Sequence, residues 1–299
     1  MVWVEHLSGR DHLVAALRRS NQPFSRPAVI IGSGFMSSPA VTWSAGSDLL
    51  FAYQRIARRG RPTERRVEAR VRRAGHSWGR PQRLGASGTF SQISVAAAPN
   101  GRMLVAWATQ DLGEEANTPW IVRAAQRPAG PRMFGATQDL DRGDGRQTRV
   151  FDRPAGRVAA TLAPDGTATV AWSSITGGGF PSNFPARVAT AGSSLRFASP
   201  QTLSPNAAVG DVTTDDQGRT LVVWATLPET GNNQITSQIF ASLRAAGAAT
   251  FATPEQLSPD ERADLPRAAF DPKTNRPTVV WITRAGHVPQ QLRVAARTR

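Results

Sequence analysis

The chain has no cysteine, one lysine and one tyrosine among its 299 residues. Without cysteine it forms neither disulfides nor thiolate metal sites, but its compartment stays open, because exported proteins can also fold without disulfides. No apolar run approaches the roughly 18 residues of a membrane-spanning helix. The N-terminus lacks the basic, apolar and small-residue order of a signal peptide. The sequence therefore predicts no membrane span, and an export signal would have to lie upstream of Met1.

The basic residues are almost all arginine. Lys273 is the single lysine, so 35 of the 36 basic residues (36 minus 1) are arginine, and the formal net charge is +14. Selection for binding polyanions would recruit both residue types, because lysine is also an effective phosphate ligand. The arginine bias, beside heavy use of Ala, Gly and Pro, instead indicates GC-rich coding. This disfavours nucleic acid as a partner and leaves a polyanion-binding scaffold as a third interpretation.

A short apolar run that ends in an aromatic residue recurs along the chain. One copy is Thr220-Leu221-Val222-Val223-Trp224, and another is Met103-Leu104-Val105-Ala106-Trp107. A repeat of about 50 residues is typical of solenoids, propellers and related arrays. The closing aromatics, separated by 50, 54, 65, 52 and 57 residues, are Trp3, Tyr53, Trp107, Trp172, Trp224 and Trp281.

Each repeat is predicted to contain four short strands, named A to D below. A tight turn such as Asn100-Gly101 or Asp165-Gly166 separates A from B, and both residues of such a pair accept positive φ. Strand B is the apolar run with its closing aromatic. Strand C alternates, and in the copy at 67–73 one set of side chains is expected to face inward and the other water. The inward set is Val67, Ala69 and Val71, and the outward set is Glu68, Arg70 and Arg72.

Strand D has the sharpest pattern, an aromatic residue followed by Pro three positions on and by Leu or Ile three positions further. Proline cannot donate a hydrogen bond to a neighbouring strand, so D is predicted to be the edge strand of each unit. A degenerate copy at 134–140 has Thr137 in place of Pro. The full copies are Phe24-Pro27-Ile30, Trp78-Pro81-Leu84, Phe197-Pro200-Leu203 and Phe251-Pro254-Leu257.

These strands predict an all-β fold, a β-propeller of about six four-stranded antiparallel blades. A sandwich fits less well, because sandwich strands do not normally repeat in sequence. Strands B and C occur six times but A and D five times, so either the ring closes unusually or the chain is a fragment of a longer repeat protein. We predict a single domain over 1–299, with blades at 1–35 (B–D only), 36–86, 87–143, 144–205, 206–260 and 261–299 (A–C only).

At the level of this blade pattern, the chain resembles bacterial β-propellers with sialidase-like, NHL-like or WD40-like blades. The resemblance covers nearly the whole chain and implies the propeller fold. The sialidase Asp-box motif is absent. Asp216, Gly218 and Trp224 follow its order, but the spacing between Gly218 and Trp224 is too long. Kelch double glycines and the WD40 Gly-His and Trp-Asp pairs are also missing. The resemblance therefore implies no activity.

The long irregular segments fall mainly between strands B and C, with a further one between D and A at 141–156. In a four-stranded blade these connections emerge on one face, so a ligand site near the axis on that face is expected. Unselected drift in loop length is the alternative. The candidate ligand-binding residues on this loop-rich face are Arg58, Arg59, Arg61, Asp111, Glu114, Glu115, Trp120, Phe180, Phe184, Asn232 and Asn233.

Three groups of residues resemble metal or catalytic sites, and each has a structural explanation. Asp139, Asp141 and Asp144 resemble a calcium loop, but turn formation explains them without metal. His6 and His12 lack a third zinc ligand. Sialidases pair a Tyr nucleophile with a Glu, and Tyr53 stands where other repeats have Trp, which indicates a blade-core residue. We therefore expect no metal and no cofactor.

The sequence is best interpreted as a non-catalytic propeller module that engages a protein or glycan through its loop-rich face. The alternative is a propeller-type glycoside hydrolase, sialidase-like, or a lyase. A hydrolase would need two carboxyl groups converging near the axis, at least one with a raised pKa. We expect a monomer, and we expect a secreted or cell-envelope location.

Overall fold

The computed structural model describes residues 2–7, 10–16, 18, 22–31, 35–56, 65–88, 90–110, 120–130, 133–143, 157–173, 184–226, 237–259, 262–283 and 291–296. Over these ranges the chain contains strands and turns but no helix. The structure therefore offers no helix that could cross a membrane in the described part of the chain.

Six antiparallel sheets follow one another along the chain, four of four strands and two of three. Within each sheet the strands pair in sequence order, as a meander. The sheets are β1–β3 (Val2–Leu7, Arg10–Ala15, Ala28–Ile31), β4–β7 (Phe35–Trp43, Leu49–Ile56, Arg65–Arg72, Gln82–Ala86), β8–β11 (Phe90–Ala97, Met103–Gln110, Ile121–Arg127, Gln138–Arg142), β12–β15 (Val158–Leu162, Ala168–Ser173, Ala186–Ala191, Gln201–Ser204), β16–β19 (Ala207–Thr214, Thr220–Thr226, Ile239–Arg244, Glu255–Gln256) and β20–β22 (Ala263–Phe270, Pro277–Thr283, Gln291–Ala296).

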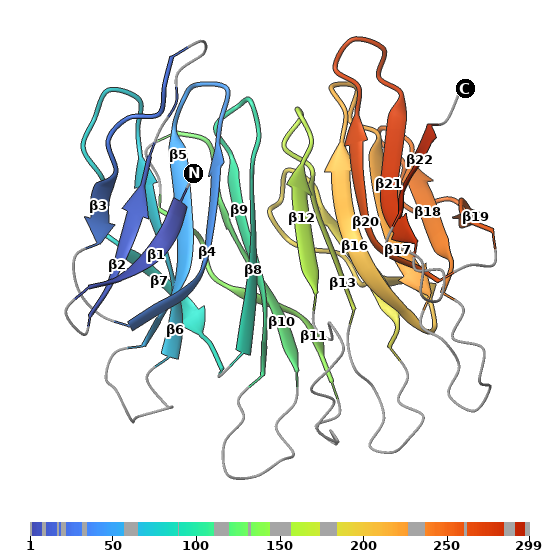
Figure 1. Cartoon of the computed structure of the whole chain (residues 1–299), viewed down its shortest axis with the longest axis horizontal. Coiled ribbons are helices and arrows are strands. Elements are labelled where there is room, and N and C mark those ends of the chain that lie inside the picture. Colours follow the sequence, from blue (N-terminus) through green and yellow to red (C-terminus); the bar gives the residue numbers. More distant parts are fainter. Residues whose placement is uncertain are drawn as a thin grey trace.

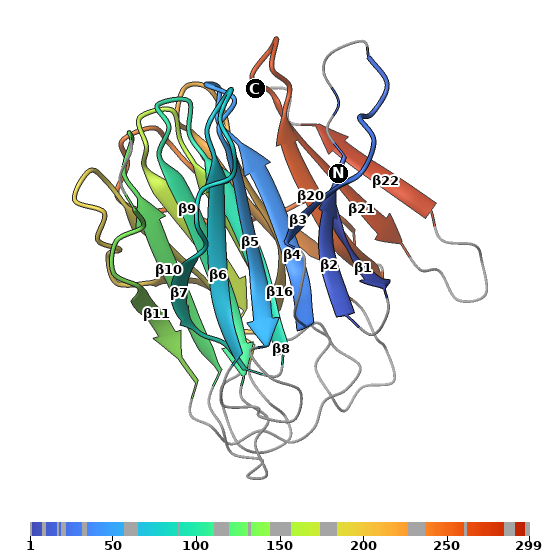
Figure 2. The ribbon, with the colours of Figure 1, turned by 90° about the vertical axis from the view of Figure 1, so that its left-hand side faces the viewer.

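The sheets are arranged around an axis, and strand A is the innermost strand. Strands β4, β8, β12, β16 and β20 each pack against the next one in this series, while β1 and β2 pack against β4. The first and last sheets stand at opposite sides in Figure 1 but on the same side of the molecule in Figure 2. The fold is the predicted all-β propeller. That its six sheets form one domain with the expected boundaries stays a prediction.

In the second to sixth sheets the closing aromatic of strand B lies in the apolar core. Trp107 and Trp172 are fully buried, and Trp224 and Trp281 are nearly so. The residues around them are small or β-branched, which suits a strand covered on both faces. Each apolar cluster joins two successive sheets, for example residues around Trp107 with residues of β5–β7. Burial of the repeated run therefore holds neighbouring blades together.

Glu68 does not face water as the strand C alternation predicted. Its side chain is buried and accepts hydrogen bonds from the Tyr53 hydroxyl at 2.7 Å and from Arg66 Nε at 2.6 Å. The physical reason is that the other face of this sheet packs on the first sheet, where Leu13 and Ile31 lie against Tyr53. A blade inside a ring has no solvent face, so strict alternation does not indicate exposure.

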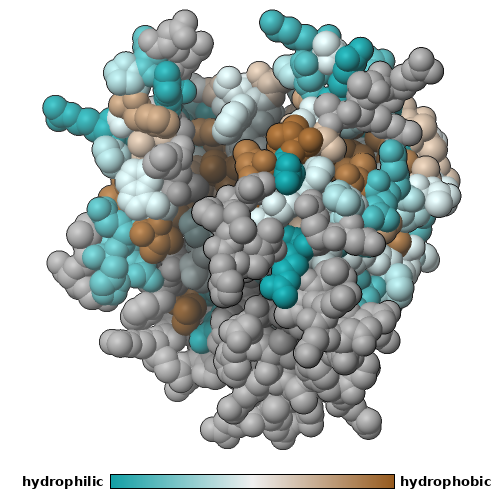
Figure 3. Space-filling view, turned by 45° about the vertical axis from the view of Figure 1, so that its right-hand side comes forward, coloured by the Kyte–Doolittle hydropathy of each residue, from teal (hydrophilic) through white to brown (hydrophobic). Residues whose placement is uncertain are grey.

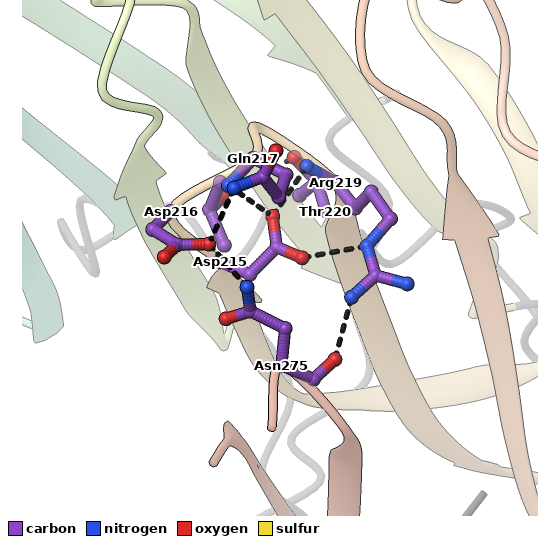
Figure 4. A network of polar contacts seen from close by, with 7 residues as sticks. Asp215, Asp216, Gln217, Arg219, Thr220 and Asn275 are labelled. Atoms are coloured by element: carbon purple, nitrogen blue, oxygen red, sulfur yellow. Dashed lines mark hydrogen bonds and ion pairs between the residues drawn. The ribbon is translucent and has the colours of Figure 1, made fainter. Parts of the chain in front are cut away.

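The strand A to strand B turns lie together at the upper end of Figure 1. Figure 4 shows how two of them are joined: Asp215 Oδ2 accepts from Arg219 Nε at 2.6 Å, and Arg219 donates onward to the carbonyl of Asn275 in the next sheet. Asn275 also donates to Asp216. Gly218 has φ +82°, a conformation that glycine adopts without strain. This end of the ring is therefore closed by turn-to-turn contacts.

Candidate functional site

Most of the predicted binding residues lie outside the described part of the chain. These are Arg58, Arg59, Arg61, Asp111, Glu114, Glu115, Phe180, Asn232 and Asn233. Trp120 and Phe184 are described, and they are only 8% and 5% exposed, in one apolar cluster between the third and fourth sheets. They are therefore not the exposed contact residues that the sequence predicted, because their rings fill the space between two sheets. Whether the loop-rich face binds a ligand stays a prediction.

Charge on the inner strands is concentrated on one side of the ring. Among the five strands β4, β8, β12, β16 and β20, charged residues occur only on β16 and β20. They are Asp211 on β16, and Asp264 and Arg267 on β20. Arg157, which directly precedes β12, adds a second guanidinium to the group. We call these four residues the axial cluster.

The two inner strands that carry the axial cluster are both bulged. The β16–β17 register shifts between Val209 and Asp211, and the β20–β21 register shifts between Asp264 and Arg267. Within the second bulge Leu265 has φ +54°, which is strained for a residue with a branched side chain. β-bulges redirect side chains and often occur next to functional sites.

The two bulges also fit into each other. A Cβ atom on Gly210 would lie 2.5 Å from the Pro266 carbonyl oxygen, so only glycine permits this approach of β16 to β20. Arg267 crosses the same contact and donates to the Gly210 carbonyl at 2.6 Å. Asp211 receives the backbone N–H of Ala268 at 3.2 Å. The pairing of the bulges therefore fixes Asp211 beside β20.

Asp211 is the carboxyl group of the cluster with a perturbed pKa. Burial raises its pKa above the ordinary aspartate value, and this effect exceeds the opposing effect of backbone N–H bonds from Ala268 and Val212 and of the Arg267 charge. The side chain is nevertheless only partly buried by surface area, and surface accessibility is what decides whether a ligand reaches it. Asp211 thus combines partial access with a pKa above that of an exposed aspartate.

The arginines of the cluster lie in mixed surroundings. Burial lowers the pKa of Arg157, the like charge of Arg267 lowers it further, and the carboxylate of Asp264 opposes both. An arginine still keeps its proton under such conditions. Arg157 therefore lies within electrostatic range of Arg267 and Asp264, and Asp211 lies within range of Arg267. This arrangement can bind an anionic group and transfer a proton in the same place.

The axial cluster extends from the middle of the inner strands towards one of their ends. Asp211 and Arg267 are each the fifth of eight residues, in β16 and β20. Asp264 is the second residue of β20, and Arg157 stands directly before β12, so these two lie at the starts of inner strands. The strand A to strand B turns follow the other ends of these strands, so Asp264 and Arg157 lie nearer the end where the strand B to strand C and strand D to strand A connections emerge.

The sequence analysis named none of the four cluster residues. Asp211 interrupts the apolar alternation of its strand directly after Gly210, and Asp264 and Arg267 flank a Leu-Pro pair. A glycine or proline beside a charge inside an apolar strand is typical of a bulge, and this signal could have identified them. Their convergence depends on packing between sheets, which one repeat read alone does not show.

The acidic groups that resembled metal ligands are paired with arginines. Asp139 accepts from Arg123 Nε at 2.9 Å, and Asp141 accepts from Arg187 Nη1 at 2.7 Å and from Trp172 Nε1 at 2.7 Å. Asp144 lies outside the described residues. His6 contacts Asp11 at 2.7 Å. The described ranges contain no group of three or more His, Asp or Glu arranged to hold a metal ion.

No protein-family model and no curated protein sequence matches the chain. Solved structures resemble it at low identity. An α-L-arabinanase of Penicillium chrysogenum complexed with arabinobiose has 12% identity and TM-score 0.49, over 83% of this chain and 77% of that one. A Hadza microbial sialidase has 9% identity and a TM-score of 0.40, over 96% of this chain and 73% of that one. A polysaccharide lyase has 9% identity and a TM-score of 0.48, and the match covers 89% of this chain but only 58% of the lyase chain. These likenesses concern the propeller fold alone.

Proposed function

We propose that this protein is a propeller-type glycoside hydrolase acting on an acidic saccharide at the axial cluster. The observation that supports the proposal is the interlocked pair of bulges, which holds Asp211, a carboxyl group with a raised pKa, beside β20 with Asp264 and Arg267. Glycoside hydrolysis requires one protonated and one ionised carboxyl group near the scissile bond. The proposal concerns the cluster, and it assigns no role to the predicted loop residues.

Asp211 is the general acid in this proposal. Its protonated carboxyl donates a proton to the glycosidic oxygen while the bond from that oxygen to the anomeric carbon breaks. Water supplies the hydroxyl group at the anomeric carbon, and Asp264 takes the proton that this water loses. The net reaction is the addition of one water molecule. Burial contributes by keeping Asp211 protonated at a higher pH than an exposed aspartate.

Arg157 and Arg267 determine the substrate class. A guanidinium binds a carboxylate through two parallel N–H bonds, and partial burial strengthens such a contact. Arg157 is partly buried, whereas Arg267 is more exposed and already donates to Gly210 and Pro266 carbonyls. Arg157 is therefore the stronger candidate for the anion contact. A saccharide carrying a carboxylate, such as a uronic acid or a sialic acid, matches this charge.

The test is hydrolysis of a panel of oligosaccharides with and without carboxylate groups, followed by their reducing ends. We expect cleavage of a carboxylate-bearing member, and we expect Asp211→Asn and Asp264→Asn to lower its rate by about 10²–10⁴-fold. Asp139→Asn is the matched control, because Asp139 is paired with Arg123 on the outer part of the third sheet. Absence of turnover on every member would reject the hydrolase, and full activity of both cluster variants would reject the axial cluster as its site.

A non-catalytic glycan- or protein-binding module remains the second candidate. It is favoured by the backbone N–H bonds to Asp211, which are those of a side chain held for structure. Calorimetric titration with the same saccharides separates the two. Binding without cleavage, weakened by Arg157→Ala and unchanged by Asp211→Asn, would identify a binding module. Binding followed by cleavage would identify the hydrolase.

A further inference from the structure

The aromatic residue of strand D fills the groove between its own sheet and the preceding one. Phe134, at the outer side of the third sheet, packs with Leu50, Leu84 and other residues of the second sheet. Phe251 of the fifth sheet packs in the same way with Val188 and Leu203 of the fourth. Trp78 of the second sheet lies edge-to-face with Phe51 in the cluster that includes the first sheet. The same position therefore seals successive grooves.

The backbone of this aromatic is also bound by the preceding sheet. Gln82 donates to the Phe134 carbonyl and accepts from the Phe134 N–H, both at 2.8 Å. Gln201 does the same for Phe251, at 3.2 and 2.9 Å. These glutamines stand four positions after the aromatic of their own sheet. Each strand D thus supplies both an aromatic plug and the receptor for the next one.

The groove between the fifth and sixth sheets has the same lining, but no aromatic residue of the described ranges fills it as Phe134 and Phe251 fill theirs. A cavity of about 300 Å³ lies there. Six of its lining residues occupy the same repeat positions, counted from the closing aromatics and strand registers, as six residues packed around Phe134. In the order of cavity residue and counterpart, they are Leu221 and Leu50, Ala241 and Ala69, Leu243 and Val71, Leu257 and Leu84, Val279 and Val105, and Ala295 and Ala125.

The described residues of the last sheet include no strand D that could carry the plug. The described strands of that sheet are ordered β20–β21–β22, so β22 forms its outer edge. In the four-stranded sheets the equivalent strand is covered by strand D. Edge strands readily accept an added strand, because their outward backbone groups can form a ladder. The cavity and the β22 edge therefore adjoin as one docking surface.

We propose that this surface binds an extended segment of another polypeptide, with an aromatic residue, Pro three positions on and Leu or Ile three further on. The repeat itself defines this occupant, since the same linings in this chain hold segments of that kind. The five copies of the pattern in the 299 residues already lie in the first five sheets. Glu255 stands at the glutamine position of the receptor and can accept the N–H of the incoming aromatic residue.

The last sheets carry apolar side chains at the surface of the molecule. In Figure 3, where the last sheets come forward, apolar side chains gather at the surface beside more polar ones. Leu292 and Val294 on β22 are 69% and 60% exposed, on the face opposite Ala295. Apolar side chains at this edge are therefore accessible to a partner strand.

The probe is a synthetic peptide with the sequence of residues 249–258, ATFATPEQLS, titrated into the whole chain by fluorescence anisotropy. We expect binding that weakens by about ten- to one hundred-fold when the peptide's Phe is replaced by Ala, because the ring then leaves the cavity empty. Equal affinity of the two peptides, or no binding of the first, would overturn the proposal.

Two variants of the protein localise the binding. Ala295→Trp fills the cavity from its rim and should abolish peptide binding, while Val294→Trp, on the opposite face of the same strand, should leave it intact. Circular dichroism checks that both variants keep the fold. Undiminished binding to Ala295→Trp would reject this groove. Analytical sedimentation of the free chain tests where the bound strand comes from. If the free chain is a dimer and Ala295→Trp dissociates it, a second copy of the chain, and not another polypeptide, occupies the groove.

Discussion

Gln201 binds the backbone of Phe251 on both sides, donating from Nε2 to its carbonyl at 3.2 Å and accepting its N–H at Oε1 at 2.9 Å. Fifty residues separate the two, one blade repeat. The pair couples strand D of the fourth sheet to strand D of the fifth, where no β-ladder connects them. A side chain thus replaces a ladder at the outer side of the ring.

Gln201→Glu should destabilise the protein by about 1–3 kcal/mol, because the carboxylate accepts the Phe251 N–H but leaves its carbonyl without the amide donor. Urea unfolding followed by tryptophan fluorescence measures the change. Gln22→Glu, at an exposed position ahead of β3, is the matched control and should have little effect. Equal stabilities of the two variants would contradict the proposed coupling between blades.

Tyr53→Phe should destabilise the protein by about 1–2 kcal/mol, since it removes a hydrogen-bond donor to the buried carboxylate of Glu68, although Arg66 and Arg55 still neutralise its charge. Burial, together with the bond to Glu68, holds the Tyr53 pKa well above the ordinary value, so the hydroxyl stays protonated. Thermal unfolding is the measurement. A cleavage defect in this variant without loss of stability would instead assign Tyr53 to catalysis.

Gly210→Ala should be strongly destabilising, by about 3 kcal/mol or more, because its Cβ would collide with Pro266 backbone and force β16 away from β20. Gly192→Ala is the control, since no heavy atom lies within 4 Å of a Cβ there. Chemical denaturation of both variants gives the comparison. Similar stabilities would mean that the two bulges do not interlock.

Stability should depend on pH through Asp211. Its folded pKa is raised above the reference value of 3.8, so its favourable contribution is complete below that value and is lost as pH rises through the folded pKa. The unfolding free energy of the wild type minus that of Asp211→Asn should therefore be larger at about pH 4 than at pH 7. A difference that grows with pH would show that the carboxylate form is the stabilised one.

Much of the fold was predictable because it is carried by local and repeated features. The apolar run with its closing aromatic indicated buried central strands such as β9 and β17, and Trp107 and Trp224 are indeed buried. The proline of strand D indicated an edge strand, and β7, β15 and β19 lie at sheet edges. A short-range pattern repeated along the chain encodes these features, so they can be read without knowing the tertiary arrangement.

The candidate site was not predictable in the same way. The sequence by itself determined the repeated strands and their aromatic cores, which are consequences of periodicity. Only the tertiary structure decided that Glu68 is buried, that Trp120 fills a gap between sheets, and that Asp211 meets Arg267. The physical reason is that these contacts join different sheets, where burial and charge depend on how neighbouring blades pack rather than on alternation within a strand.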